Sequence, residues 1–303
     1  MTAAVRTAQN YKDIFDNGSG AAMAQQVSDF TRVRLANGVN VFQRGPRMLQ
    51  FGMDATRTGI IETPSARQLQ PILDAAAQPR QLRHLTADVR AVIGAEAAAS
   101  LLAELLSYRI IVPVTPTQLL VLGNSPLSQA LCHLLERCGP SVHTPKKHGS
   151  ELEFLRAADP CSPLVVVDSL SRARAVAKLA KTRSGPTVPV MLVDSKVILG
   201  PLRLSPRDPC PACLHLYLLD RDAGWDLALH QLPAGPLQPD PVVLAAGAAA
   251  AAAYIRRVAG LPDPPGVDAE PPAPGQVLVI DPFGPQLRTE HMLRPHPRCQ
   301  VCY

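Results

Sequence analysis

Two Cys-x-x-Cys pairs are the residues of this chain whose type and spacing predict chemistry most directly. The first pair is Cys210 and Cys213, and the second is Cys299 and Cys302. Four thiolates satisfy the tetrahedral preference of Zn²⁺, and a two-residue spacer lets both sulfurs of a pair reach one ion at about 2.3 Å. Because four protein ligands leave no position for an activated water, we expect a zinc site that is structural and not catalytic.

Two disulfides, or one redox-active pair beside a coincidental second pair, are the alternatives to zinc. Pairs at both ends of one long region, in a chain whose composition is typical of the cytoplasm, favour the metal. Cys213 and Cys299 lie too far apart in sequence for a zinc finger, so the ion would tie the last residues back onto a domain interior. His296, three residues before Cys299, is expected beside the site and not as a ligand.

Length and composition restrict the class of protein. At 303 residues the chain has room for two domains, and 47% hydrophobic residues supply a substantial core. The net charge of +5 is spread along the chain, without the basic block that binds nucleic acid or an anionic membrane. The first residues contain no uninterrupted apolar segment, and the alanine-rich run at 242–258 predicts a buried helix. We therefore expect a cytoplasmic protein with no nucleic-acid and no membrane partner.

The N-terminal third predicts a tail and a small domain. Residues 1–35 are polar and lack sustained periodicity, which indicates a flexible tail. Within residues 36–113, three short apolar runs indicate strands at 39–43, 49–53 and 58–62, and three segments of helical periodicity follow them. Three strands followed by three helices predict a winged-helix-like module.

Residues 117–303 alternate between strand and helix patterns. Buried-strand runs at 119–122, 164–167 and 188–193 are separated by helical segments, so we expect a doubly wound, Rossmann-like α/β domain with a parallel sheet. An extra strand at 196–199 and a closing hairpin follow, and the hairpin would deliver the second cysteine pair.

The turn after the first α/β strand occupies the position of a phosphate-binding loop. A Gly-x-Gly-x-x-Gly loop needs glycine where the backbone approaches the pyrophosphate and where helix meets strand. Here only Gly123 remains, because Ser125 and Ser128 stand at the other glycine positions, and Pro126 removes a backbone donor. We expect a structural strand-turn-helix and no bound nucleotide.

Three blocks carry a resemblance to a known family. They are residues 41–54 (VFQRGPRMLQFGMD), 200–225 (GPLRLSPRDPCPACLHLYLLDRDAGW) and 296–302 (HPRCQVC). Together they resemble the ThiF/ubiquitin-activating-enzyme-like proteins, specifically the cyclodehydratase C-type, leader peptide-binding proteins of azole-forming ribosomal peptide biosynthesis (TOMM). The likeness covers residues 36–303. It implies a winged-helix RiPP recognition element followed by a degenerate adenylating-enzyme domain with a four-cysteine zinc site.

The chain departs from the catalytic relatives at two places. Active ThiF-like enzymes have a glycine-rich loop where this chain has Gly123 and two serines, and they have a later Asp-x-x-Asp-Asn whose second Asp holds Mg²⁺. The corresponding residues run from Asp168 to Arg172, and Ser171 replaces the metal-binding carboxylate. The resemblance therefore implies that the chain is not catalytic alone, that ATP chemistry lies in a YcaO-type partner, and that this fold recognises a precursor leader peptide. A homodimer is a further partner to consider.

Leader recognition has a physical route, because an extended peptide can add as a strand to an exposed sheet edge. The family places this groove between the third strand and the third helix. Carried over to this chain, the groove consists of Thr58, Ile60 and Glu62 facing Ala98, Leu101, Leu102 and Leu105. The alternative is that the leucines only pack the core of the small domain.

Three functions compete. The leading hypothesis is a noncatalytic, zinc-containing peptide-recognition and scaffold protein for a YcaO-type cyclodehydratase. The second is a ThiF-type ATP-dependent adenylyltransferase. The third is a winged-helix DNA-binding regulator, which is disfavoured because the expected recognition helix at 95–107 contains no basic residue.

Overall fold

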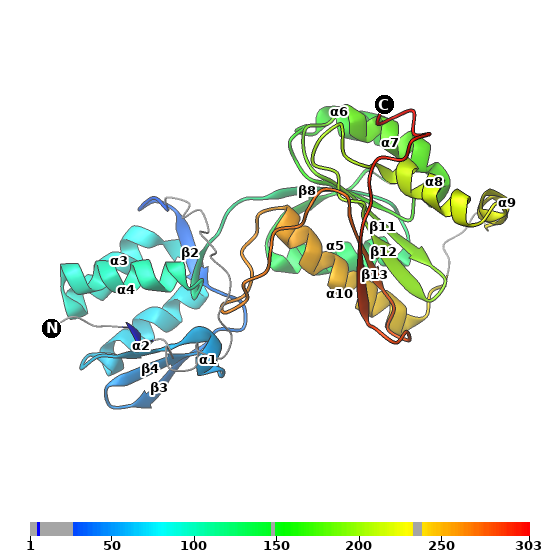
Figure 1. The fold of residues 1–303 in the computed structure, drawn as a ribbon. Coiled ribbons are helices and arrows are strands. Elements are labelled where there is room, and N and C mark those ends of the chain that lie inside the picture. The colour runs from blue at the N-terminus through cyan, green and yellow to red at the C-terminus, as the bar shows by residue number, and fades with distance from the viewer. Residues whose placement is uncertain (1–4, 7–26, 147–148, 233–237) are drawn as a thin grey trace. The chain divides into compact units, whose positions relative to one another are not determined.

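The computed structural model describes residues 5–6, 27–146, 149–232 and 238–303 (Figure 1). The chain forms two compact units, one comprising Met1–Thr115 with Pro262–Glu270, the other Pro116–Leu261 with Pro271–Tyr303. The sequence-based boundaries assign residues 262–270 to the second domain, but this segment packs with the first unit. The Arg109 guanidinium donates to the Val267 carbonyl oxygen at 2.8 Å, a contact between distant segments that no local pattern predicts.

An antiparallel meander lies at the start of the first unit, with strand order β1-β5-β4-β3. Its strands are β1 (Val5–Arg6), β3 (Val41–Gly45), β4 (Met48–Phe51) and β5 (Ile60–Glu62), and the short helix α1 (Ala55–Thr58) joins β4 to β5. Leu49 and Phe51 are buried on one face of β4, as the two-residue period of a strand requires. The meander therefore presents one apolar face to the core.

Three helices follow the meander: α2 (Ala66–Asp74) with its 3₁₀ extension η2 (Ala75–Ala77), α3 (Leu82–Ile93) and α4 (Ala95–Ser107). Helix α2 packs against β3 and β4, and α3 packs against α2 and α4. Leu69 and Leu73 of α2 are four residues apart, as are Leu85 and Val89 of α3, so each pair lies on one helix face. All four are 0% exposed in the core of the unit.

A second, three-stranded sheet completes the first unit. Its order is β6-β2-β7, and its strands are β2 (Arg32–Leu35), β6 (Arg80–Gln81) and β7 (Ile111–Pro113). Strand β2 lies within residues 1–35, which the sequence predicts to be a tail. That boundary is wrong because Val33 and Leu35 alternate into the core, where they are 0% and 4% exposed. Four residues are too few to show this periodicity in the sequence.

The second unit is built on a seven-stranded sheet of order β14-β13-β12-β11-β10-β8-β9. The strands are β8 (Gln118–Leu122), β9 (Ser141–His143), β10 (Leu164–Val167), β11 (Thr187–Val193), β12 (Lys196–Leu199), β13 (Gln276–Ile280) and β14 (Arg288–Met292). Strands β9, β8, β10 and β11 are parallel, and β12, β13 and β14 are antiparallel to their neighbours.

The expected parallel sheet is thus a mixed sheet. The reason is the connection between β11 and β12, where only Asp194 and Ser195 separate the strands and Asp194 has a positive φ of 53°. Two residues can join antiparallel strands but cannot make the crossover that a parallel pair requires.

Helices pack on both faces of this sheet. The helices are α5 (Pro126–Cys138), α6 (Glu151–Ala157), α7 (Ala173–Lys181), α8 (Pro211–Arg221), α9 (Trp225–His230) and α10 (Pro241–Val258). Leu119 and Val121 of β8 face the side of α5 and α10, whereas Leu120 and Leu122 face the side of α6 and α7. Strands buried on both faces give the continuous apolar runs seen in the sequence.

Helix α10 is, within the described part of the chain, the one helix long and apolar enough to cross a membrane. In the structure it packs against α5 and β12. A Cβ added at Gly247 would lie 2.3 Å from Val197 Cγ2, so glycine permits this close approach of helix and strand. The predicted helix is present and is buried along one face, with 39% of its residues buried.

Candidate functional site

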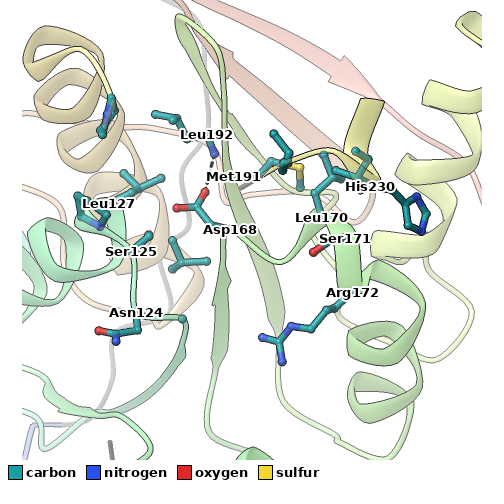
Figure 2. Close-up of a pocket in the computed structure, with 16 residues that line it drawn as sticks. Asn124, Ser125, Leu127, Asp168, Leu170, Ser171, Arg172, Met191, Leu192 and His230 are labelled. Carbon is teal, nitrogen blue, oxygen red and sulfur yellow. Dashed lines mark hydrogen bonds between the residues drawn. The ribbon is translucent and has the colours of Figure 1, made fainter. Parts of the chain in front are cut away.

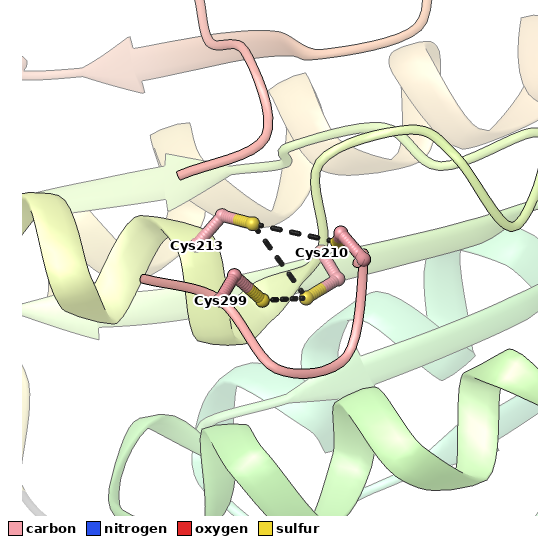
Figure 3. Close-up of side chains that lie close together, drawn as sticks. Cys210, Cys213 and Cys299 are labelled. Carbon is pink, nitrogen blue, oxygen red and sulfur yellow. Dashed lines mark hydrogen bonds between the residues drawn. The ribbon is translucent and has the colours of Figure 1, made fainter. Parts of the chain in front are cut away.

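The structure brings the four predicted cysteines together (Figure 3). Cys210 is the N-cap of α8 and Cys213 lies in its first turn, while Cys299 and Cys302 belong to the segment that follows β14. The Sγ–Sγ distances are 3.8 Å for Cys210–Cys213, 3.6 Å for Cys210–Cys299 and 3.5 Å for Cys213–Cys302.

These distances fit one metal ion and exclude disulfides. Four sulfurs at about 2.3 Å from a tetrahedral ion are about 3.8 Å apart, whereas bonded sulfurs are about 2.05 Å apart. All four ligand atoms lie within 4.8 Å of one another, and all four cysteines are free thiols. The chain therefore contains a four-thiolate cluster that could hold a metal ion.

Local structure favours a thiolate at Cys213, one of the four sulfurs. Pro211 is tolerated in the first turn of α8, and the N-terminus of a helix stabilises negative charge. The Cys213 Sγ accepts a hydrogen bond from the Cys210 thiol and from the backbone N–H of His296, and these bonds lower the pKa of Cys213 well below its ordinary value. Burial raises the pKa of Cys302. Binding of a metal ion by all four sulfurs requires thiolates, so it would release the protons of those cysteines that are thiols in the metal-free protein.

His296 holds the terminal segment beside the cluster without contributing a ligand. Its side chain is only 4% exposed, and its Nε2 and Asp220 Oδ2 share a hydrogen bond of 2.8 Å. The His296 Nδ1 accepts from the Arg298 backbone N–H at 3.1 Å, and the Arg298 guanidinium also pairs with Asp220. The ring of Tyr217 packs edge-on against the imidazole, with centroids 4.7 Å apart. We call Asp220, His296 and Arg298 the terminal clasp.

The turn after β8, at the position of a phosphate-binding loop, lines a pocket of about 670 Å³ at the carboxyl ends of β8, β10 and β11 (Figure 2). Gly123 has a φ of +123°, and a Cβ there would lie 2.7 Å from the Val167 carbonyl oxygen. Strand packing alone therefore requires this glycine. Its presence is no evidence for a phosphate.

Ser125 and Ser128, which stand where a phosphate-binding loop has glycines, form hydrogen bonds with backbone groups of the same turn. Ser125 caps α5 by accepting from the Ser128 backbone N–H at 3.2 Å, and the Ser128 hydroxyl donates to the Gly123 carbonyl oxygen at 3.0 Å. Pro126 has no N–H. At this helix N-terminus the cap thus takes up one backbone donor that a phosphate could use, and Pro126 lacks another.

Asp168 is the acidic residue among those that line the pocket. Its backbone is left-handed, with a φ of +49°, and its Oδ1 accepts from the Leu192 backbone N–H at 2.8 Å. Loss of hydration raises the pKa of this carboxyl, and a hydrogen bond from the Ser125 hydroxyl opposes the shift. The carboxylate is committed to the protein's own polar groups.

Ser171 and Arg172 also line the pocket. Ser171 lies in the 3₁₀ turn η3 (Leu170–Arg172), and the Arg172 guanidinium forms a bidentate pair with Glu151 at 2.8 and 3.0 Å. Among the described residues, the four cysteines are the one group of His, Cys, Asp and Glu side chains placed to hold a metal ion.

The residues expected to form a peptide groove do not line one surface. Ile60 and Glu62 lie on β5, but Thr58 ends α1 and its hydroxyl donates to the Phe51 and Asp54 carbonyl oxygens. The four α4 residues are buried in the core, at 0 to 4% exposed: Ala98, Leu101, Leu102 and Leu105. Helix α4 packs mainly on α3 and β7. The four therefore pack the core, which is the alternative that the sequence leaves open.

The main chain of β5 nevertheless offers a defined edge. Phe51 donates its backbone N–H to the Gly59 carbonyl oxygen at 3.3 Å, and Thr63 donates to that of Arg47 at 2.7 Å. Along an antiparallel strand, the backbone N–H and C=O groups of successive residues point to alternate sides. The groups of Gly59, Ile61 and Thr63 therefore face β4, and those of Ile60 and Glu62 face away from it. We call these outward-facing groups of Ile60 and Glu62 the β5 edge.

Two solved heterocyclase structures share the fold of this chain. The first, "Heterocyclase in complex with substrate and Cofactor", has a TM-score of 0.55 and 17% sequence identity. The match covers 90% of this chain and 39% of the heterocyclase chain. The second, "Structure of the heterocyclase TruD", has a TM-score of 0.53 and 18% sequence identity, and the match covers 90% of this chain and 43% of the TruD chain. This chain thus spans about two fifths of each heterocyclase chain.

At these identities the likeness shows the fold, and the resemblance to heterocyclase components that the sequence predicts is confirmed at that level. No protein-family model matches the sequence, and no curated protein matches it.

Proposed function

We propose that this chain is a noncatalytic, zinc-containing protein that recognises a precursor peptide and serves as a scaffold for a YcaO-type cyclodehydratase. The observation that carries the proposal is the pocket at the ends of the parallel strands. In a fold shared with heterocyclases, Ser125 and Asp168 direct their polar atoms to the protein's own backbone. A pocket in which the Ser125 hydroxyl and the Asp168 carboxylate are already bonded to backbone N–H groups is suited to a binding protein, so we assign ATP-dependent chemistry to the partner.

Zinc is the ion that the cluster suits best. Four thiolates in tetrahedral arrangement are soft ligands that select zinc over magnesium, calcium or manganese. With every position filled by a cysteine, the ion would supply folding free energy by joining α8 to the last residues of the chain, and it would activate no water.

Peptide recognition is assigned to the first unit. Its meander followed by α2, α3 and α4 supports a winged-helix-like RiPP recognition element. The β5 edge would bind an extended leader peptide through main-chain hydrogen bonds, since β-strand addition gives affinity without a preformed deep pocket. In this role Ile60 and Glu62 act through their backbone, whereas Thr58 closes the turn before the strand.

Binding to encoded peptides tests this function. Fluorescence anisotropy with labelled peptides from short Cys/Ser/Thr-rich reading frames beside the gene should show saturable binding to the whole chain. Ile60→Pro removes an outward-facing N–H and should abolish binding, and the matched Ile60→Ala should retain it. Adding the neighbouring YcaO-type enzyme with ATP should then release one water per azoline formed, detected by mass spectrometry. The proposal would be overturned if the chain bound none of these peptides and did not bind the YcaO-type enzyme.

An ATP-dependent adenylyltransferase is the second candidate. It is favoured by the pocket of about 670 Å³, because α/β sheets bind nucleotides at the carboxyl ends of their strands. Pyrophosphate exchange with ATP and the same peptides separates the two functions. We expect no exchange, and exchange that is lost in Asp168→Ala would establish the enzyme instead.

A further inference from the structure

The β5 edge is already paired with a segment of the same chain. Strand β1 is antiparallel to β5, with Arg6 opposite Ile60 and Val5 opposite Ile61. Because the main-chain groups of Ile61 face β4, the β1 strand uses those of Ile60, which face away from the meander. The N-terminal strand thus lies where an added peptide strand would lie.

This pairing is short. The β1 strand has two residues, and a backbone hydrogen bond contributes about 0.5–1.5 kcal/mol to stability after its competition with water. A pairing of two residues would hold a separate peptide at this edge only weakly. Because β1 is covalently joined to the chain, however, its local concentration at the edge is on the order of millimolar, which is enough to favour a weak contact.

We propose that β1 is an intramolecular competitor that covers the β5 edge until a longer extended peptide displaces it. The inference rests on the peptide-recognition function proposed for this edge. A peptide that pairs with all of Ile60–Glu62 forms more backbone hydrogen bonds than the two-residue β1 and therefore replaces it. The edge is also protected from pairing with unrelated strands while no peptide is bound.

The chain's own N-terminal sequence is the probe that tests this competition. A labelled synthetic peptide of residues 1–12 is titrated into the full chain and into a variant that begins at residue 27, with circular dichroism to verify that both are folded. We expect binding to the shortened chain and binding at least about fivefold weaker to the full chain, because the tethered copy occupies the edge. Equal affinities, or no binding to a folded shortened chain, would overturn the proposal.

A pair of point variants tests the same contact in the full chain. Arg6→Pro removes the N–H opposite Ile60 and should raise the affinity for the probe to that of the shortened chain, whereas Arg6→Ala keeps the N–H and should leave the edge covered. If Arg6→Ala opens the edge as fully as Arg6→Pro, strand pairing is not the cause and the proposal fails. The probe contains no precursor peptide, so this result is independent of the test of the proposed function.

Discussion

The backbone N–H of His296 donates to the Cys213 Sγ at 3.3 Å, although 83 residues separate the two in sequence. The same histidine shares a side-chain hydrogen bond with Asp220, seven residues beyond Cys213 on α8. The last residues of the chain are thus attached to α8 through the cluster and through the terminal clasp. The two attachments make separable predictions.

Loss of a ligand should remove the metal and destabilise the second unit. Cys299→Ser replaces a soft thiolate by a hydroxyl and should lower the zinc content from about one per chain to near zero. The free energy of unfolding, measured in urea, should then fall by much of the roughly 10 kcal/mol that a structural zinc site contributes. Cys161→Ser is the control, because Cys161 is exposed and lies outside the cluster. Full stability of metal-free protein would contradict a structural role.

The clasp should determine how firmly the metal is kept. Asp220→Ala leaves the buried Nε2 of His296 without its partner, which should lower the free energy of unfolding by about 1–3 kcal/mol. It should also speed the transfer of zinc to a chelator. Asp222→Ala, which removes one exposed hydrogen bond to the Gly224 backbone near the end of the same helix, should leave the transfer rate unchanged. Equal rates for the two variants would show that the clasp does not support the cluster.

Gly123 should matter for packing and not for nucleotide binding. Gly123→Ala places a methyl group against the Val167 carbonyl oxygen and should cost about 1–3 kcal/mol more than Gly139→Ala. Both glycines have positive φ, but a Cβ at Gly139 meets nothing within 4 Å, so the difference measures the collision alone. Thermal unfolding of both variants, with and without ATP, provides the measurement. Stabilisation of the native protein by ATP would contradict this interpretation.

Asp168 should make the native state more stable as the pH falls. Because its pKa is raised in the folded protein, the neutral form is favoured there, and this contribution is lost as the pH rises through the folded pKa. Asp168→Asn removes the titration and tolerates the left-handed backbone. Urea unfolding followed from pH 8 down towards the ordinary aspartate pKa of 3.8 should therefore show the native protein gaining stability relative to the variant as the pH decreases. A difference that is constant with pH would disprove the assignment.

Several elements follow from local patterns and were predictable. The expected strands at 119–122, 164–167 and 196–199 appear within one residue as β8, β10 and β12, since runs of apolar β-branched residues and leucines specify buried strands. Other elements depend on distant contacts. Thr58 reads as a strand residue, but the cap that Asp54 provides through the Thr56 N–H turns that segment into α1. Helix periodicity identifies the apolar face of α4 without revealing which neighbour covers it.

The sequence alone identified the four cysteines that could hold a metal ion, because the two-residue spacer within each pair is a local property and sulfur chemistry does not depend on the fold. It also determined that the glycine-rich loop is reduced to Gly123. Only the tertiary structure decided that Ser125 and Asp168 bind backbone groups, that the sheet is mixed, and that β1 covers the β5 edge. These features arise when segments far apart in the chain pack together, and their free energy is not encoded in any single stretch of residues.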